Sequence, residues 1–343
     1  MTGRNAVKTV LIAALAAGAA LAPGAHARAA DEPIHLKLPM NAPLTSPVYV
    51  RSTKPWIDKV EAEAGGAIKI DTFPGGQLAS PSNIYDRLVN NVFELAYGIH
   101  GSLGNLFPRT SVAELPFLAT EGTHSSVALW NLIENGAIAS EYAQVKPLAV
   151  FVYPQAQIHT SKPVHTMEDL KGLKIATSSK LGGDVLEALG ATAINVPPPD
   201  LYSTLNRHMV NGSLMMWTGV VQFKLPEVTS FHLETMLGSS TGFVLMNKPA
   251  YAKLPKAAQQ AIDANSGRVL SARYGHELDG IAADQRKEVG AMPGHQVLEL
   301  PAAEMARWRE KAASVYDEWV ARTPDGAKVL AAWKSELKKE GAM

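Results

Sequence analysis

Residues 173–196 read LKIATSSKLGGDVLEALGATAINV, and this stretch decides the fold. Leu173–Ala176 and Ala193–Val196 are short apolar runs that predict buried strands, and Gly183–Leu189 between them predicts a helix. A strand, a helix and a strand in this order form a βαβ unit, in which the two strands are parallel. The stretch therefore predicts an α/β protein.

The same alternation continues on both sides of this unit. Before it, the pattern predicts strands at Ile34–Met40, Ile68–Phe73, Phe93–Tyr97 and Ala149–Tyr153, with helices at Val48–Ala64 and from Ser80 to Leu88. After it come a helix at Tyr202–Val210, strands at Leu214–Trp217, Phe243–Met246 and Gln296–Leu300, and helices at Lys256–Val289, Ala302–Thr323 and Gly326–Lys339. Such alternation is typical of parallel sheets with helices on both faces.

The alternation falls into two runs, which predicts two α/β lobes. The chain is expected to cross between them at Tyr153–Ser161 and again near Ser239–Phe243. Lobe I then comprises residues 30–154 and 243–282. Lobe II comprises residues 155–242 and 283–343, including the C-terminal helices. A chain with 46% hydrophobic residues has enough apolar surface to bury a core in each lobe.

The first 29 residues have the pattern of a secretory signal peptide. Arg4 and Lys8 precede the alanine-rich apolar run Val10–Ala22, and small residues of the Ala-x-Ala type follow at Ala25–Ala29. The chain has no cysteine, so it is expected to carry neither disulfides nor an N-terminal lipid on cysteine. We expect a periplasmic protein without a lipid anchor.

The charge and motifs exclude several classes of function. Removing the predicted leader, which has three basic residues and no acidic one, leaves 29 basic and 32 acidic residues. Nucleic-acid binding needs a basic face, so this balance argues against it. The sequence has no G-x-S-x-G, Walker, H-E-x-x-H or G-x-G-x-x-G motif. Its ten histidines have no metal-ligand spacing, and we expect no metal, no cofactor and no catalysis.

Six segments in order resemble one family. Ile68–Leu78 is similar to the "KIxxxxxPGGQLG" segment of the substrate-binding proteins of tripartite ATP-independent periplasmic (TRAP) transporters. The further segments are Glu114–Phe117, Asp169–Ile175, Leu186–Ala191, Val210–Gly212, and Trp217 with Phe223–Thr229. The resemblance, of the DctP-like type, covers nearly all of the chain after the leader.

The resemblance implies a Venus-flytrap fold: two α/β lobes, a ligand cleft between them, and long C-terminal helices that brace both. It also implies a monomeric receptor that delivers a small organic solute to the membrane permease of a TRAP transporter. Family ligands are commonly organic acids, held by an arginine after "DLKGLKI". A guanidinium presents two parallel donors to a carboxylate, which explains that choice.

This chain departs from the family pattern at the clamp. Ala176 stands where the arginine is expected, and Lys180 lies four residues further on. Lys180 is a candidate for the missing charge, although a lysine in this position is more often solvated. Lysine lacks the planar fork of arginine and would hold an acid less selectively.

The other candidate ligand contacts follow strand ends, where binding residues of α/β folds gather. In lobe II they are Thr177, Ser178, Trp217 and, after a three-proline turn, Tyr202. Tryptophan offers a broad apolar face with one hydrogen-bond donor, and its alternative role is core packing. For Thr177 and Ser178 the alternative is a turn or a helix cap.

The remaining candidates lie in lobe I and at the first crossover. They are Asn41, Tyr97, His100 and Asn247 in lobe I, and Gln155, Gln157 and His159 at the crossover. The alternatives are a helix cap for Asn247 and ordinary packing for Tyr97 and His100. An acid with an apolar or aromatic body fits this set. A neutral or zwitterionic solute, a partnership with a membrane sensor, and a periplasmic enzyme on this fold remain alternatives.

Overall fold

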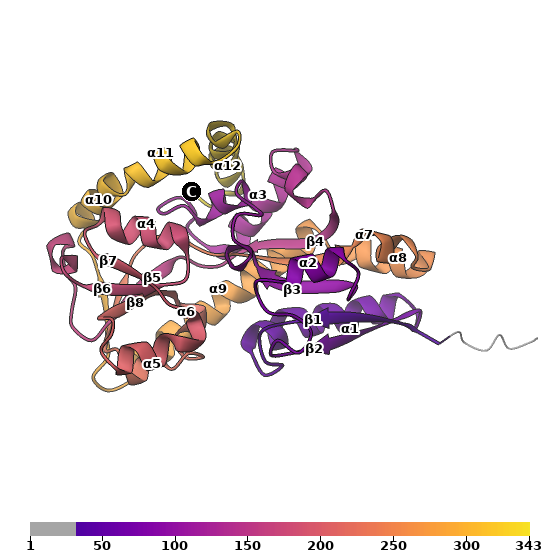
Figure 1. Ribbon diagram of the computed structural model, residues 1–343, viewed down its shortest axis with the longest axis horizontal. Helices are drawn as coiled ribbons and strands as arrows, with labels where there is room; N and C mark the ends of the chain where they lie inside the picture. The colour runs from indigo at the N-terminus through magenta and orange to yellow at the C-terminus, as the bar shows by residue number, and fades with distance from the viewer. Residues whose placement is uncertain (1–31) are drawn as a thin grey trace, which may run out of the picture. The chain divides into compact units, whose positions relative to one another are not determined.

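The computed structural model describes residues 32–343, so the predicted signal peptide lies outside the described residues (Figure 1). Residues 33–343 form one compact unit. Its strands are β1 (Ile34–Pro39), β2 (Ile68–Phe73), β3 (Leu95–Ile99), β4 (Val145–Val152), β5 (Ala156–Thr160), β6 (Lys174–Thr177), β7 (Thr192–Asn195), β8 (Gly212–Met216), β9 (Phe231–Glu234), β10 (Thr241–Asn247) and β11 (Gln296–Glu299).

The helices alternate with the strands in the first two thirds of the chain and then dominate. They are α1 (Lys54–Glu63), α2 (Ile84–Val89), α3 (Gly122–Glu134), α4 (Lys180–Ala188), α5 (Leu201–Asn206), α6 (Trp217–Val220), α7 (Lys248–Ala252), α8 (Lys256–Ala264), α9 (Arg268–Gly290), α10 (Ala302–Lys311), α11 (Ala313–Arg322) and α12 (Gly326–Glu340). A π-helical turn, Tyr49–Thr53, leads into α1.

The predicted βαβ unit is confirmed as β6, α4 and β7, with β6 and β7 parallel. Ser179 starts the helix, because its side chain accepts a hydrogen bond from the Gly182 N–H group at 3.2 Å. Gly182 allows α4 to pack closely on the sheet. A Cβ atom there would lie 2.8 Å from the Thr177 hydroxyl and 3.0 Å from the Leu214 side chain.

The six-stranded sheet is mixed and the three-stranded sheet is antiparallel, whereas the alternation predicted parallel sheets. The six-stranded sheet has the order β11-β9-β5-β8-β6-β7, and β5 runs antiparallel to both of its neighbours. The three-stranded sheet has the order β3-β10-β4, with β10 antiparallel to both β3 and β4. β1 and β2 form a separate parallel pair.

Two short segments join the three-stranded and six-stranded sheets. Residues 153–155 connect β4 to β5, and residues 235–240 connect β9 to β10. The predicted first crossover, Tyr153–Ser161, therefore contains a complete strand, β5. The lobe boundaries themselves stay a prediction.

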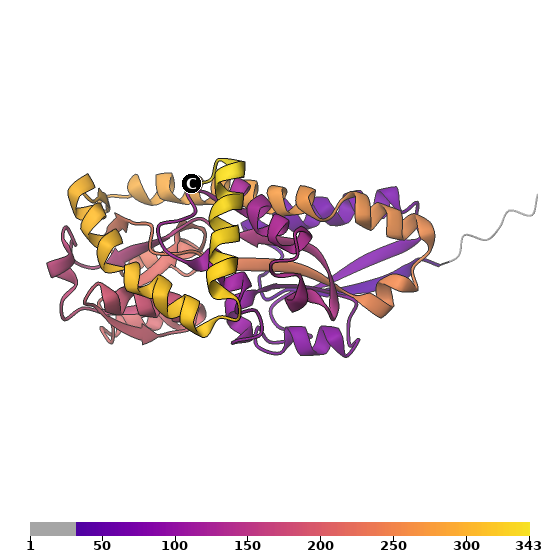
Figure 2. The same cartoon turned by 90° about the horizontal axis from the view of Figure 1, so that it is seen from above.

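Helix α9 contacts elements of both sheets. Its Tyr274 ring stacks on Phe151 of β4 with ring centroids 4.3 Å apart. Nearer its C-terminus, Gln285 accepts a hydrogen bond from the Val221 N–H group at 3.1 Å, just after α6. The predicted helix Lys256–Val289 is interrupted at Gly267 (φ 72°), which separates α8 from α9. Figure 2 shows α12, in yellow, crossing α3, where Asn131 donates a hydrogen bond to Glu336 at 3.0 Å.

Candidate ligand-binding site

One edge of the six-stranded sheet gathers the ends of several strands. The parallel strands β6 and β8 end there at Thr177 and Met216. Antiparallel β5 begins at the same edge, because Ala156 pairs with Met216. β9 also ends there, and the hydroxyl of Thr235, the next residue, donates to the Ala156 carbonyl at 2.9 Å. Four strand ends thus meet on one edge, as at ligand sites of α/β folds.

The three-stranded sheet contributes a second edge, and the two links hold the edges together. β4 ends at Val152 and β10 begins at Thr241, which are paired. The Ser239 hydroxyl donates to the Tyr153 carbonyl at 2.7 Å, so the links are bonded to each other. We call this region, between residues 153–160, 213–218 and 232–241, the junction.

Gln155, Gln157 and His159 lie on one face of the β5 segment, because side chains alternate along a strand. The Gln155 amide oxygen accepts a hydrogen bond from the Gly238 N–H group at 3.0 Å. The Gln157 amide oxygen accepts one from the Thr235 N–H group, and its amide nitrogen donates to the Gln155 carbonyl at 3.1 Å. Both glutamines therefore fasten one link to the other.

Trp217 begins α6 at the end of β8 and is 3% exposed. Its ring lies against two imidazoles, with centroids 5.1 Å from His159 and 5.4 Å from His232. The structure thus brings Trp217, His159 and the two glutamines together. Thr177 lies on the same edge of the sheet, and its hydroxyl accepts a hydrogen bond from the Ser179 N–H group at 3.2 Å. Ser178, next to it, is exposed.

Three donors at the junction have no hydrogen-bond partner among residues 32–343. They are the Nε1–H group of Trp217, the amide nitrogen of Gln155 and the hydroxyl of Ser213, and all three side chains are more than nine-tenths buried. Gln155 and Trp217 are the residues next to Ala156 and Met216, the last pair of the β5–β8 ladder. An unpaired buried donor is costly, so such a group needs an explanation, and a ligand atom is one.

Tyr97 and His100 line the three-stranded sheet. The Tyr97 hydroxyl is 2.9 Å from that of Tyr153, which begins the first link. Burial is the largest cause that raises the pKa of Tyr97 well above its ordinary value. His100 Nε2 is 2.9 Å from the Tyr142 hydroxyl, and burial lowers the His100 pKa to about 3. Both are neutral groups beside the junction at neutral pH.

The polar atoms of Asn247 and Lys180 are paired away from the junction. Asn247 ends β10 at the far end from Thr241, where its side chain accepts from the Ala250 N–H group at 2.9 Å and caps α7. Lys180 is the first residue of α4, with a side chain 73% exposed and 2.9 Å from Asp184. Asp184 also accepts from Arg322 at 2.8 Å.

Asn41 and Tyr202 are both half-buried. Asn41 follows β1, and its side-chain oxygen lies near Gly76. Tyr202 lies in α5, where a hydrogen bond to the Glu227 carboxylate raises the Tyr202 pKa. In the part of the chain that the structure describes, neither residue forms a hydrogen bond with Trp217 or with the glutamines.

Two residues at or beside the junction, Glu114 and His232, were not among the predicted ligand contacts. Glu114 is buried and accepts hydrogen bonds from the hydroxyl and the N–H group of Thr241, at 2.9 and 3.3 Å. Burial raises the Glu114 pKa to about 7. In the sequence, Glu114 stood out only as part of the segment Glu114–Phe117, which resembles the TRAP family. His232 lies on β9, which was not predicted, although the alternation of apolar and polar residues in Phe231–Glu234 is a signal that could have found it.

Position 176, where the resembled family has an arginine that holds the ligand carboxylate, has no positive charge in this chain. Ala176 is fully buried and packs with Trp217 and Met215. A carboxylate at the junction would meet the neutral donors of Trp217 and Gln155 instead. Such bonds are charge-assisted through the carboxylate, but they lack the ion pair and the planar fork that a guanidinium provides.

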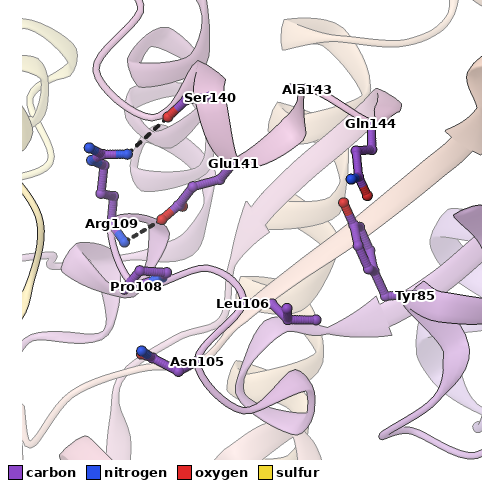
Figure 3. A pocket seen from close by; sticks show the side chains of 9 residues that line it. All are labelled: Tyr85, Asn105, Leu106, Pro108, Arg109, Ser140, Glu141, Ala143 and Gln144. Carbon is purple, nitrogen blue, oxygen red and sulfur yellow. Dashed lines mark hydrogen bonds between the residues drawn. The ribbon is translucent and has the colours of Figure 1, made fainter.

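A surface hollow elsewhere has its charged groups already paired (Figure 3). It encloses about 440 Å³ and is lined by Tyr85, Asn105, Leu106, Pro108, Arg109, Ser140, Glu141, Ala143 and Gln144. The Arg109 guanidinium donates to Ser140 and Asp325, both at 2.9 Å. Glu141 accepts from the N–H group and the hydroxyl of Thr110, at 2.9 and 2.7 Å. This hollow therefore offers no free charge, and none of the predicted site residues lines it.

A second hollow, of about 240 Å³, contains two glutamates. Glu234 and Glu299 both pair with Arg286, at 2.6 and 3.6 Å. Across residues 32–343 there is no group of three or more histidine, aspartate or glutamate side chains that could hold a metal ion. None of the described helices is long and apolar enough to cross a membrane.

Comparison with known proteins identifies relatives along most of the chain. The profile of the bacterial extracellular solute-binding protein family 7, DctP, matches residues 39–323. The outer membrane transporter protein TsaT of Comamonas testosteroni is 28% identical over 251 residues, which are 72% of this chain and 74% of that protein.

Solved structures of TRAP solute-binding proteins superpose closely on this one. A protein from Rhodoferax ferrireducens, in complex with copurified benzoate, has a TM-score of 0.84 and 30% identity. The match covers 90% of this chain and 98% of that one. A marine metagenome protein specific for aromatic acid ligands, in complex with 3-hydroxybenzoate, has a TM-score of 0.85 and 27% identity, over 90% and 99% of the two chains.

Proposed function

Because this chain belongs to the bacterial extracellular solute-binding protein family 7, the DctP family of TRAP solute receptors, we propose that its ligand is an aromatic carboxylic acid. The observation that carries this proposal is the pair of unpartnered, buried donors on Trp217 and Gln155. The benzoate and 3-hydroxybenzoate of the two related structures support it, because both ligands combine a flat ring with a carboxylate.

Each part of such a ligand meets a suitable group at the junction. The ring packs against the apolar face of Trp217. The carboxylate accepts hydrogen bonds from the Trp217 Nε1–H group and from the Gln155 amide. These bonds satisfy two donors that otherwise stay unpaired in a buried place.

Ligand entry requires the two sheets to move apart. Trp217 and Gln155 are 3% and 6% exposed, so a ligand cannot reach them while the junction is closed. The links 153–155 and 235–240 are the segments about which opening occurs. A ligand that contacts both sides favours the closed form, because only differential contacts shift such an equilibrium.

The further expectations from the sequence belong to the same proposal. The protein is exported through its signal peptide and works as a monomer in the periplasm without a lipid anchor. There it hands its ligand, unchanged, to the membrane permease of a TRAP transporter. The permease recognises the closed, loaded form.

Calorimetric titration with matched ligands tests the proposal. Benzoate and 3-hydroxybenzoate are compared with benzamide, which keeps the ring and removes the charge, and with acetate, which keeps the carboxylate and removes the ring. We expect binding of both aromatic acids, at least about tenfold weaker binding of acetate, and a rise in unfolding temperature only with ligands that bind. Failure of every aromatic acid to bind would contradict the proposal.

A neutral aromatic solute is the second candidate, and Ala176 in place of the family arginine favours it. The junction donors are uncharged and would also bond to a carbonyl group. Benzamide decides between the candidates: binding equal to or tighter than that of benzoate identifies a receptor for neutral solutes.

A further inference from the structure

Three histidines form a continuous chain of hydrogen bonds beside Trp217. His159 Nε2 lies 3.1 Å from the Met215 carbonyl oxygen, and His159 Nδ1 lies 2.8 Å from His232 Nδ1. His232 Nε2 in turn lies 3.0 Å from His295 Nδ1. His159 is fully buried and His295 is half-buried, so the chain leads from the interior towards the surface.

The Met215 carbonyl gives this chain one direction. A carbonyl oxygen only accepts hydrogen bonds, so Nε2 of His159 carries the proton. Burial lowers the pKa of His159 to about 3 and that of His232 to about 4, so both rings are neutral at neutral pH. In a neutral imidazole the second nitrogen is an acceptor. His159 Nδ1 therefore accepts from His232 Nδ1–H, and His232 Nε2 accepts from His295 Nδ1–H.

The two inner rings of this chain are the ones that contact the proposed ligand wall. The His159 ring meets the Trp217 ring at an interplanar angle of 78°, and the His232 ring meets it at 48°. The His295 and His232 rings are nearly parallel, with an interplanar angle of 7°, as expected for two rings joined by an in-plane hydrogen bond. Beside His232 on β9, Glu234 pairs with Arg286 of α9 at 2.6 Å. Among residues 32–343, the side-chain hydrogen bonds of His159 and His232 are those of this chain.

We propose that His159, His232 and His295 are positioning residues for the Trp217 wall. Their one-directional chain fixes each of the two buried imidazoles in a single tautomer, and the indole is oriented by packing against them. His295 is the terminal donor: without it, the buried Nε2 of His232 loses its partner, and the His232 ring is held only through its Nδ1–H bond to His159. The proposal rests on the proposed function for its effect on affinity, but the tautomers do not depend on any ligand.

Nitrogen-15 NMR of the exported form of the full chain tests the tautomers at pH 7.5. Two-bond proton–nitrogen correlations distinguish Nδ1–H from Nε2–H, and each ring is assigned with single histidine variants. We expect the proton on Nε2 in His159 and on Nδ1 in His232 and His295. A proton on Nε2 of His232, or averaging between its tautomers, would overturn the proposal.

A matched pair of variants at the half-buried end tests the positioning role. His295→Asn keeps an amide donor near the place of Nδ1, whereas His295→Leu removes it. We expect His295→Leu to leave the His232 proton on Nδ1, because His159 Nδ1 still accepts it, but to shift the Trp217 indole N–H resonance and to weaken benzoate binding by about threefold or more, equivalent to about 0.65 kcal/mol. His295→Asn should leave the resonance and the affinity close to those of the natural protein.

An unmoved Trp217 resonance in His295→Leu would overturn the positioning role, whatever the tautomers are. If the natural protein does not bind benzoate, the proposed function fails, while the tautomers and the indole resonance still decide this proposal. The two failures are therefore distinguishable.

Discussion

At the scale of single residues, Trp217 gives the proposed site both an apolar ring face and a hydrogen-bond donor. Its ring lies against His159 and His232, and its donor has no partner among the described residues. Replacing it by phenylalanine keeps a flat apolar face and removes only the donor. Replacing it by alanine removes both.

We expect Trp217→Ala to weaken aromatic-acid binding by at least tenfold, or about 1.4 kcal/mol. Trp217→Phe should lose less, because the remaining ring still packs against the ligand. Titration calorimetry with benzoate measures both variants. Unchanged affinity in Trp217→Ala would remove this residue from the site.

Lys180 permits an equally direct test of charge. Its side chain is 73% exposed and paired with Asp184, and exposed ion pairs contribute little. We expect Lys180→Met to change benzoate affinity by less than about twofold. Selective loss of acids, with benzamide binding unaffected, would instead assign the missing positive charge to this lysine.

At the scale of elements, the boundary between α8 and α9 depends on one backbone conformation. Gly267 has φ 72°, and its N–H group donates to the Leu148 carbonyl at 2.6 Å. A Cβ atom there would lie 3.1 Å from the Trp130 ring. The start of the long helix is thus anchored on β4 through a position that favours glycine.

We expect Gly267→Ala to lower the free energy of unfolding by about 1–3 kcal/mol, from backbone strain and crowding against Trp130. Gly294→Ala is the control, because Gly294 has φ 83° but no atom within 4 Å of its Cβ position. Urea unfolding followed by circular dichroism compares the two. Equal losses would mean that backbone conformation alone is responsible.

The predicted elements were mostly right in place, and the misses share one cause. Every residue of β5 is buried, including Gln157, His159 and Thr160. Its sequence, Ala-Gln-Ile-His-Thr, nevertheless alternates between apolar and polar residues, as does Phe-His-Leu-Glu of β9, and alternation over only four or five residues is a weak signal. Because β5 and β9 were missed, the sheets were expected to be parallel, and His232 was not considered.

At the scale of the whole molecule, buried titratable groups link stability to pH with opposite signs. The pKa values of His100, His159 and His232 are lowered from 6.5 to about 3, 3 and 4, mainly by burial. Below pH 6.5 the unfolded chain binds protons at these sites and the native protein does not. Their contribution to stability is therefore present above pH 6.5 and is lost as the pH falls.

Glu114 acts in the other direction, because burial raises its pKa from 4.5 to about 7. Between these values the native protein binds a proton that the unfolded chain does not, so this group favours folding as the pH falls from 7 to 4.5. As the pH falls, the stability lost through the three histidines exceeds the stability gained through Glu114. We expect the urea midpoint to fall between pH 6.5 and 4.5.

The substitution Glu114→Gln tests the contribution of Glu114 to the pH dependence of stability, which is opposite in sign to that of the histidines. The amide keeps an acceptor for Thr241 but cannot titrate, so the loss of stability towards acid should become steeper than in the natural protein. At pH 8 the variant should be at least as stable, because it no longer buries a charge. Identical slopes in urea titrations at pH 8, 6.5 and 5 would show that Glu114 does not titrate in this range.

The sequence by itself determined the α/β class, the βαβ unit and the family, because these depend on local periodicity and on short segments in a fixed order. It also marked Trp217, which follows a predicted strand end, and Gln155, Gln157 and His159, which lie at the predicted first crossover. Only the tertiary structure decided which of the candidates meet. Pairing of β5 between β8 and β9 placed these four side chains at one junction, while Lys180 and Asn247 bond to neighbours along their own helices. Strand order and register are long-range properties, and a single sequence carries little local signal for them.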